Sequence, residues 1–353
     1  MKVVITGGAG FIGSNLIRHM ILSKKYSIIN IDKLTYAGNL SSLKDIEGSP
    51  SYKFINEDIA NIDKIKELIL DEKPDSIMNL AAESHVDRSI DDPSSFLKTN
   101  IMGTYSLLES SREFIKDLSE SKRRDFCFHH VSTDEVFGSL GKFNKFDENS
   151  NYSPNSPYSA TKASSDHLVR AWGETFDIPY LITNCSNNYG PYQHPEKLIP
   201  KTILCALNRN PINIYGSGNN IRDWLYVEDH VEALLEVLNN PKKGETFCIG
   251  GNNELKNIDV ALKICSILDE ISPCEDSNIK SYKDLIVLVQ DRPGHDKRYA
   301  IDSTKITKDL NWIPKEDFNS GIKKTVEWYL ENQKWCNNLS SISSSKDRIG
   351  LGN

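Results

Sequence analysis

A tyrosine and a lysine four residues apart, Tyr158 and Lys162, could form a catalytic pair. On a helix they would share one face, and an ammonium beside a phenol lowers the pKa of the phenol from its usual value of about 10. The resulting phenolate is a base that can work near neutral pH. Because Tyr-x-x-x-Lys also occurs by chance in many helices, this interpretation needs support from the rest of the chain.

Two adjacent carboxyl groups, Asp134 and Glu135, precede the pair and follow an apolar run that ends at Thr133. The run has the composition of a strand, and open α/β sheets bind their ligands at the carboxyl ends of strands. An acid and a base beside a phenolate indicate several proton transfers on one substrate. Ser156-Pro157 is expected to start the helix that carries the tyrosine.

The glycine-rich N-terminus supports a nucleotide site. Residues 2–6 read as a strand, residues 7–13 have the spacing Gly-x-x-Gly-x-x-Gly, and a helical pattern follows. This arrangement lets backbone N–H groups approach a pyrophosphate. A second strand ends at Asp32, close to the offset of about 20 residues expected for an acid that binds ribose hydroxyls. A carboxylate there repels a 2′-phosphate and favours NAD over NADP, although the neighbouring Lys33 weakens that preference.

Alternating strand and helix patterns over the first half predict an α/β fold with a Rossmann-type, doubly wound parallel sheet. We expect three parts: an NAD-binding domain over residues 1–186, a smaller C-terminal α/β substrate domain over 187–338 with some segments returning to the first, and a disordered Ser-rich tail over 339–353. Asp58 could reach the adenine edge or cap the following helix, and these two roles remain open.

Composition excludes several classes of function. The net charge of −7 and the lack of a large basic block argue against a nucleic-acid partner. Seven scattered cysteines indicate reduced thiols, and no ligand spacing predicts a metal. No apolar run is long enough to span a membrane, and the N-terminus does not have the pattern of a signal peptide, so a cytoplasmic protein is expected.

Five further motifs resemble one family closely. They are His85-Val-Asp-Arg-Ser89, Ser132-Thr-Asp-Glu-Val-Phe-Gly138, and the segments 187–200, 222–230 and 291–296. With the glycine-rich start, they make the chain similar to the extended short-chain dehydrogenases that act on nucleotide sugars, and within these to the dTDP-glucose 4,6-dehydratases. The resemblance covers roughly residues 1 to 335, and Ser217, where relatives often carry an acid, departs from it.

The resemblance implies a reaction on a dTDP-sugar with a retained NAD. Tyr158, assisted by Lys162, would take the proton of the 4-hydroxyl, to which Thr133 would hydrogen-bond. Glu135 would remove the C5 proton, Asp134 would protonate the departing 6-hydroxyl, and hydride would return to C6. The product would be dTDP-4-keto-6-deoxyglucose. The resemblance also implies a homodimer that pairs the helices near 94–119 and 156–176 in a four-helix bundle.

The same comparison extends the two binding sets. The cofactor set is Gly7, Gly10, Phe11, Ile12, Gly13, Asp32, Lys33, Leu34, Thr35, Asp58, Ile59, Leu80, Ala81, Ala82, Ser84, Thr99, Tyr158, Lys162 and Asn188. The substrate set is Ser84, Thr133, Asn187, Lys197, Leu198, Asn213, Tyr215, Arg222, Asn257, Arg292 and His295.

Three alternatives remain. The first is the same dehydration on a UDP- or CDP-sugar, which sequence discriminates poorly because a few loop contacts select the base. The second is a sugar-nucleotide 4-epimerase or decarboxylase, against which Asp134 and Glu135 argue, since epimerisation has no elimination step. The third is an idle NAD-binding regulator, which would be expected to have lost Tyr158, Lys162 or Glu135.

Overall fold

A seven-stranded parallel sheet forms the centre of the protein, whose computed structural model describes residues 1–240 and 242–342. The strand order is β10-β6-β5-β4-β1-β2-β3, which confirms the predicted doubly wound α/β sheet. The strands are β1 (Lys2–Thr6), β2 (Ser27–Asp32), β3 (Tyr52–Asn56), β4 (Ser76–Asn79), β5 (Cys127–Thr133), β6 (Tyr180–Cys185) and β10 (Glu245–Ile249).

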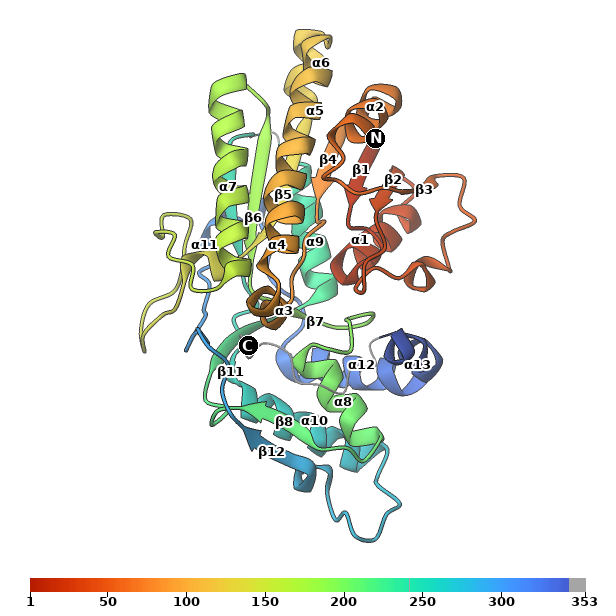
Figure 1. Ribbon diagram of the computed structural model, residues 1–353, viewed down its shortest axis with the longest axis vertical. Helices are drawn as coiled ribbons and strands as arrows, with labels where there is room; N and C mark the ends of the chain where they lie inside the picture. The colour runs from red at the N-terminus through yellow and green to blue at the C-terminus, as the bar shows by residue number, and fades with distance from the viewer. Residues whose placement is uncertain (241, 343–353) are drawn as a thin grey trace.

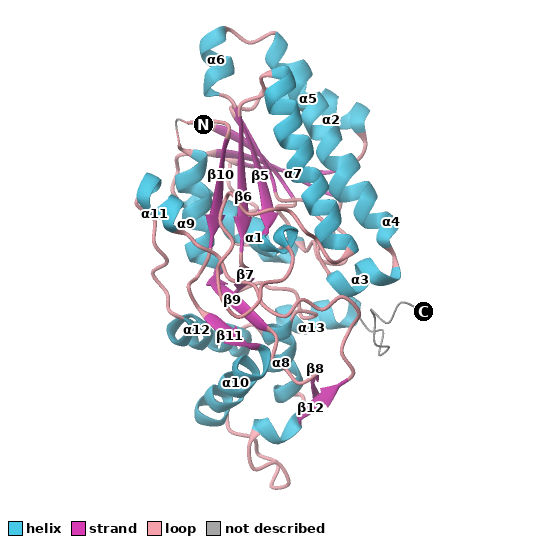
Figure 2. Cartoon of the chain, turned by 90° about the vertical axis from the view of Figure 1, so that its left-hand side faces the viewer, coloured by secondary structure: helices cyan, strands magenta, loops and turns pink. Residues whose placement is uncertain are grey.

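Helices cover both faces of this sheet, as Figure 2 shows. One face carries α2 (Ile62–Glu72), α5 (Thr104–Lys116) and α7 (Pro157–Phe176), and the other carries α1 (Phe11–Leu22), α9 (Val227–Leu238) and α11 (Thr304–Leu310). Every residue of β4, β5 and β6 is buried. Near-continuous apolar strands of this kind are typical of parallel sheets that are covered on both sides.

A second, smaller group of elements lies below the carboxyl edge of the sheet in Figure 1. A three-stranded sheet comprises β7 (Asn187–Tyr189), β9 (Ile221–Tyr226) and β11 (Glu254–Lys256), and β8 (Ile212–Tyr215) pairs with β12 (Ile286–Val289). The helices of this group are α8 (Leu198–Leu207), α10 (Asn257–Ile271), α12 (Phe318–Glu331) and α13 (Gln333–Ile342). Its core combines aliphatic side chains with aromatic ones, among them Tyr189, Trp224 and Tyr329.

The remaining helical segments are short. They are α3 (Val86–Asp91), α4 (Pro93–Phe96), a π-helix η2 (Leu97–Gly103), α6 (Glu120–Asp125) and three 3₁₀ turns, η1 (Leu40–Leu43), η3 (Asp134–Phe137) and η4 (Tyr282–Leu285). The helix expected near 94–119 therefore has a widened turn at η2. Helix α13 includes residues 339–342 of the predicted tail, and 343–353 lie outside the described residues.

No helix among the described residues is both long enough and apolar enough to cross a membrane. The cysteines at 127 and 248 are buried in strands, as their positions predict, and all seven cysteines are free thiols.

The start of α7 is fixed by a reciprocal cap. The Ser156 hydroxyl accepts from Ser159 N at 3.1 Å, and Ser156 N donates to the Ser159 hydroxyl at 3.0 Å. Pro157 occupies the first turn, where its missing N–H costs nothing. This cap determines where Tyr158 enters the helix.

Replacing the capping serine should therefore destabilise the protein. We expect Ser156→Ala to lower the free energy of unfolding by about 1 kcal/mol, because the backbone N–H of Ser159 loses its hydrogen-bond partner. Thermal melting of the purified variant measures this. Ser164→Ala is the matched control, since Ser164 is exposed in the same helix and bonds only the Ala160 carbonyl. Equal melting temperatures for the two variants would contradict the capping role.

Candidate active site

The carboxyl ends of five strands open on one cavity of about 280 Å³. Gly7 follows β1, Asp32 ends β2, Leu80 follows β4, Thr133 ends β5 and Cys185 ends β6, and all of these residues line it. The order of the sheet reverses between β4 and β1, and ligands of doubly wound sheets bind at such a switch point. The cavity therefore lies where this fold binds nucleotides.

The glycine-rich loop forms one wall with its backbone. Gly7 has φ +72°, and a Cβ atom there would lie 2.6 Å from Ala81 N; a Cβ at Gly13 would lie 2.3 Å from the Gly7 carbonyl oxygen. Both positions therefore exclude any larger residue. Helix α1 begins at Phe11 with no side-chain cap on its first turn, so its free N–H groups and dipole suit an anion. The loop leaves room for a pyrophosphate.

Asp32 ties the glycine-rich loop to the end of β2. Its carboxylate accepts from Ala9 N at 3.0 Å and from Leu34 N at 2.8 Å. Burial raises the pKa of Asp32, and the two backbone hydrogen bonds oppose that rise. A carboxylate has lone pairs left after these two bonds, so Asp32 can still accept from ribose hydroxyls.

Lys33 is held by anionic and polar neighbours on the same wall. Its ammonium donates to the Thr99 hydroxyl at 2.8 Å and lies 3.8 Å from the Asp58 carboxylate and 4.0 Å from that of Glu83. Its charge is thus largely compensated, which limits the attraction for a 2′-phosphate. Asn61, not Asp58, is the N-cap residue of α2, and Asp58 instead accepts from Ala60 N at 3.0 Å.

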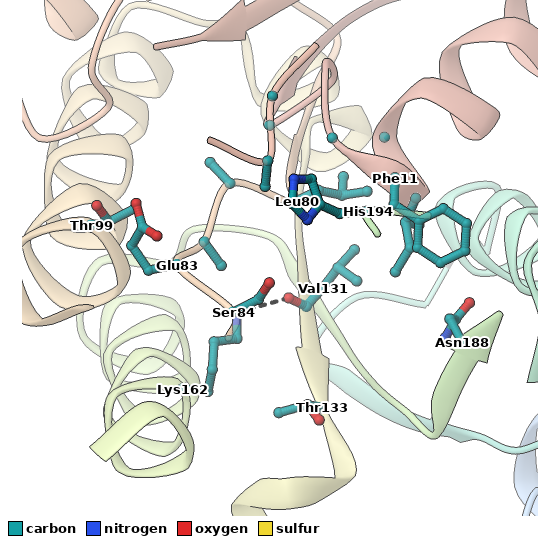
Figure 3. A pocket seen from close by; sticks show the side chains of 18 of the residues that line it. Phe11, Leu80, Glu83, Ser84, Thr99, Val131, Thr133, Lys162, Asn188 and His194 are labelled. Carbon is teal, nitrogen blue, oxygen red and sulfur yellow. Dashed lines mark hydrogen bonds between the residues drawn. The ribbon is translucent and has the colours of Figure 1, made fainter. Parts of the chain in front are cut away.

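The five predicted catalytic residues converge on the cavity. Thr133 caps η3, accepting from Glu135 N at 3.3 Å, and its hydroxyl donates to the Asp134 carboxylate at 3.4 Å. Lys162 reaches from α7 to donate to the Val131 carbonyl at 2.9 Å (Figure 3). The residues that line the cavity together are Thr133, Asp134, Glu135, Tyr158 and Lys162.

Burial raises the pKa of both carboxyl groups, but the charges around the two groups differ. Burial raises the pKa of Asp134 well above its ordinary value, and the charges of Glu135 and Asp223 raise it further. Burial also raises the pKa of Glu135, but the cations of Arg292, Arg222 and Lys197 oppose that rise. Asp134 is therefore the better proton donor of the two, and Glu135 is the better base.

The lowered pKa predicted for Tyr158 is wrong for the folded chain. Burial raises the pKa of Tyr158 well above 10, and the charge of Glu135 adds to that rise, while hydrogen bonding with Thr133 opposes it. Burial also lowers the pKa of Lys162. The spacing of four residues brings the groups to one face, but it does not reveal how deeply both are buried.

The predicted binding residues divide into two groups. Leu34 and Asp58 lie beside the cavity rather than in its lining, whereas the other predicted cofactor residues line it. Of the predicted substrate residues, Ser84, Thr133, Asn187 and Lys197 line it, and Lys197 donates to the Ser84 carbonyl at 2.9 Å. The remaining seven lie outside the lining, in the lower group of elements: Leu198, Asn213, Tyr215, Arg222, Asn257, Arg292 and His295.

Two of these outer residues meet at Asp87 of α3. The Arg292 guanidinium donates to one carboxylate oxygen at 2.8 Å, and the Tyr215 hydroxyl donates to the other at 2.8 Å. Arg222 is buried against the Tyr299 ring, with its guanidinium carbon 4.2 Å from the ring centroid. The charges of Arg222 and Arg292 both lower the pKa of Glu135, so both guanidinium groups act on this carboxyl group.

Several lining residues were not predicted from the sequence. Two of them, Glu83 and His194, are labelled in Figure 3. Glu83 lies two residues before the motif that begins at His85, so its place beside small residues could have indicated it. Four others lie within motifs already noted, namely Ser132, Gln193, His194 and Glu196. The rest come from strand ends and loops that carried no separate signal: Ile31, Ala37, Gly38, Glu57, Val131, Cys185 and Ser186.

Comparison with known proteins places this site in a family. Residues 4–325 match the family model described as GDP-mannose 4,6 dehydratase. A dTDP-glucose 4,6-dehydratase from Shigella flexneri is 55% identical over 350 residues, which cover 97% of this chain and 96% of that protein.

Solved structures of dTDP-glucose 4,6-dehydratases are also similar to this chain. The dTDP-glucose 4,6-dehydratase of Bacillus anthracis, in complex with NAD, has a TM-score of 0.84 and 41% identity, over 96% of this chain and 99% of that one. The dTDP-glucose 4,6-dehydratase of Streptomyces venezuelae, with NAD and the ligand TYD bound, has a TM-score of 0.87 and 38% identity, over 96% and 100%. The resemblance found in the sequence is thereby confirmed: the chain belongs to the dTDP-glucose 4,6-dehydratase family.

Proposed function

We propose that this chain is an NAD-dependent hydro-lyase that converts dTDP-glucose to dTDP-4-keto-6-deoxyglucose. The observation that carries the proposal is the convergence of an acid, a base and a tyrosine–lysine pair on one cavity beside a glycine-rich loop. The names of the relatives support the substrate, and the two carboxyl groups with opposed environments support the elimination.

The residues present fit NAD. Gly7 and Gly13 leave space that any side chain would fill, the first turn of α1 offers free N–H groups, and Asp32 offers a carboxylate for the ribose. NAD, when bound, supplies the acceptor and later the donor of one hydride, and its cationic ring adds positive charge. That charge, with Lys162, would offset the burial that raises the pKa of Tyr158.

The protein's own groups then move the protons. Tyr158 takes the proton of the sugar 4-hydroxyl as hydride leaves C4, and Thr133 orients that hydroxyl. The 4-ketone acidifies the C5 proton, which Glu135 removes. Asp134, whose raised pKa keeps it protonated, donates to the 6-hydroxyl as it leaves as water. Return of hydride to C6 and of a proton to C5 completes the reaction, so the sugar loses one water.

Residues of the lower elements would hold the nucleotide diphosphate. Arg222, Arg292 and Lys197 are cations near the catalytic carboxyl, and arginine suits bidentate contact with phosphate. Ser84, Asn187, Leu198, Asn213, Tyr215, Asn257 and His295 complete the proposed substrate set. We thus propose that residues 1–186 chiefly bind the cofactor and that 187–338 chiefly bind the sugar nucleotide.

We also propose that two copies pair through α5 and α7. These helices lie side by side on one face of the sheet, and Leu97 and Met102 in the adjoining π-helix are each 51% exposed. Apolar side chains at that level of exposure are suited to an interface. A bundle of two helices from each copy would cover them.

The reaction itself is tested by mass spectrometry of products from dTDP-glucose, UDP-glucose and CDP-glucose in separate tubes. We expect loss of one water from the dTDP sugar alone, without added NAD if the cofactor is retained. Water loss from UDP- or CDP-glucose instead would support another nucleobase. Unchanged mass with galactose appearing by NMR would support an epimerase and overturn the acid–base assignment.

Two variants separate the steps. We expect Glu135→Gln to reduce the bound NAD in a single turnover but to lower product formation by about 10²- to 10⁴-fold, because the C5 proton has no acceptor. Tyr158→Phe, the matched variant, should block NAD reduction itself. The absorbance of NADH after mixing with substrate measures NAD reduction in both variants, and mass spectrometry measures product formation. Product formation by Glu135→Gln at the wild-type rate would exclude it as the base, and normal NAD reduction by Tyr158→Phe would exclude the tyrosine.

The assembly is tested by sedimentation at micromolar concentration. We expect a dimer for the wild-type chain and a monomer for the double variant Leu97→Glu, Met102→Glu, since two carboxylates would be buried in the interface. Leu288→Glu is the control, because Leu288 is 58% exposed on β12, away from these helices. A wild-type monomer, or a dimer that survives the double change, would contradict this interface.

A further inference from the structure

A buried group of polar side chains lies behind the catalytic lysine, on the side away from the cavity. Lys162 is 4% exposed, and both His130 of β5 and Asp166 of α7 are fully buried. The Lys162 ammonium lies 3.4 Å from His130 Nε2, which in turn lies 3.4 Å from an Asp166 carboxylate oxygen. Lys162 and Asp166 are one helical turn apart, so both project from the same side of α7.

The hydrogen bonds of Asn79 assign the proton on His130. The Asn79 side-chain oxygen accepts from the Thr6 hydroxyl at 2.7 Å, and its nitrogen donates to the Thr104 hydroxyl at 3.2 Å. That same nitrogen faces His130 Nδ1 at 3.2 Å, so Nδ1 must accept. In a neutral imidazole the proton is then on Nε2, the nitrogen that lies 3.4 Å from Asp166. Burial lowers the pKa of His130 to about 4, so the ring is neutral at pH 7.

The Asp166 carboxylate is held in its ionised form. Its second oxygen accepts from the Tyr152 hydroxyl at 2.9 Å and from the Asn184 amide at 3.0 Å. Tyr152 accepts in turn from the Arg170 guanidinium at 2.8 Å. Although burial raises the pKa of Asp166, hydrogen bonding with His130 and the charge of Lys162 outweigh it and bring the pKa below its ordinary value.

Asp166 is the carboxylate whose charge acts on Lys162. The titratable groups that act on the ammonium or lie near it are Asp166 of α7, His130 of β5 and Cys185 of β6, and Tyr158 of α7 lines the same cavity. Burial raises the pKa of Tyr158 well above 10 and that of Cys185 to about 12, so both are neutral at pH 7, as is His130. Of these four, Asp166 alone carries a charge opposite to that of the ammonium. A buried ammonium without such a partner tends to lose its proton.

We propose that Asp166 is a positioning residue that keeps Lys162 protonated, with His130 as the neutral group that fixes the direction of its carboxylate. A protonated Lys162 is what favours the Tyr158 phenolate, so the pair acts on the first proton transfer through the lysine. This inference rests on the proposed function, in which Tyr158 takes the proton of the 4-hydroxyl.

The test is the pH dependence of NAD reduction in a single turnover with dTDP-glucose. Asp166→Asn removes the charge and keeps the size, so Lys162 should lose its proton more easily and Tyr158 should ionise at higher pH. Loss of the negative charge of Asp166 also acts directly on Tyr158 and lowers its pKa, which is the opposite effect. This direct effect is weak, because eight residues of helix separate the two side chains by about 12 Å. We expect the acidic limb of the profile to move up by about 1 pH unit or more, with about a tenfold slower reduction at pH values below it.

Matched variants separate charge from structure. Asp177→Asn removes a carboxylate from the end of the same helix, where the side chain is exposed, and should leave the profile in place. Asp166→Glu keeps the charge and should restore the acidic limb towards its original pH. A slower Asp166→Asn enzyme with an unshifted profile would overturn the proposal, because a structural defect lowers the rate at every pH. If Asp166→Asn does not fold, Tyr152→Phe removes one donor to the carboxylate and should shift the limb in the same direction by less; an unshifted limb there would also overturn it.

Failure of the proposed function is distinguishable from failure of this inference. If the wild-type chain does not reduce NAD with any of the three nucleotide sugars, the proposed reaction itself is contradicted. If the wild-type chain does reduce NAD and its pH profile is the same as that of Asp166→Asn, only the role proposed for Asp166 is contradicted.

Discussion

Ionisable groups buried together at the carboxyl edge of the sheet impose the constraint on which the rest of the structure depends. Asp134 is 1% exposed and Lys162 is 4% exposed, and burial alone would neutralise both. Burial leaves Asp134 protonated, whereas neighbouring charges oppose its effect at Lys162 and at Glu135. For Glu135, the cations come from the lower elements, through Arg222, Arg292 and Lys197. The lower elements therefore set the charge of a catalytic group that lies on the sheet.

The order of the sheet fixes how closely the walls of the cavity approach. Strands β1 and β4 are neighbours, so the loops that follow them are packed against one another, and Gly7 has no room for a side chain beside Ala81. The loop after β4 is held by Asn100 of the π-helix, which accepts from Glu83 N at 2.9 Å and donates to the Glu83 carbonyl at 3.1 Å. One buried amide thus links the widened helical turn to the cavity wall.

The elements of the sheet and the catalytic residues could be predicted because their signals are local. The glycine spacing, the offset of Asp32 and the Ser156-Pro157 start of α7 depend on short stretches of chain. The contacts of Arg292 could not be predicted from the sequence, because its partner Asp87 lies 205 residues away along the chain. The raised pKa of Tyr158 is of the same kind, because it depends on burial beside Glu135, which only the folded chain determines.

The pairing of Arg292 with Asp87 gives the proposed substrate pocket a filter. Because the guanidinium already has an anionic partner, and Tyr215 holds the other oxygen of that partner, an incoming anion gains little by simple attraction. A lone inorganic phosphate would have to exchange places with a carboxylate that is fixed by two donors. A ligand that also binds through its sugar and its base gains enough binding free energy from those contacts to displace the carboxylate. Abundant small anions would then be kept out, even though Arg222, Arg292 and Lys197 act on the same carboxyl group, that of Glu135.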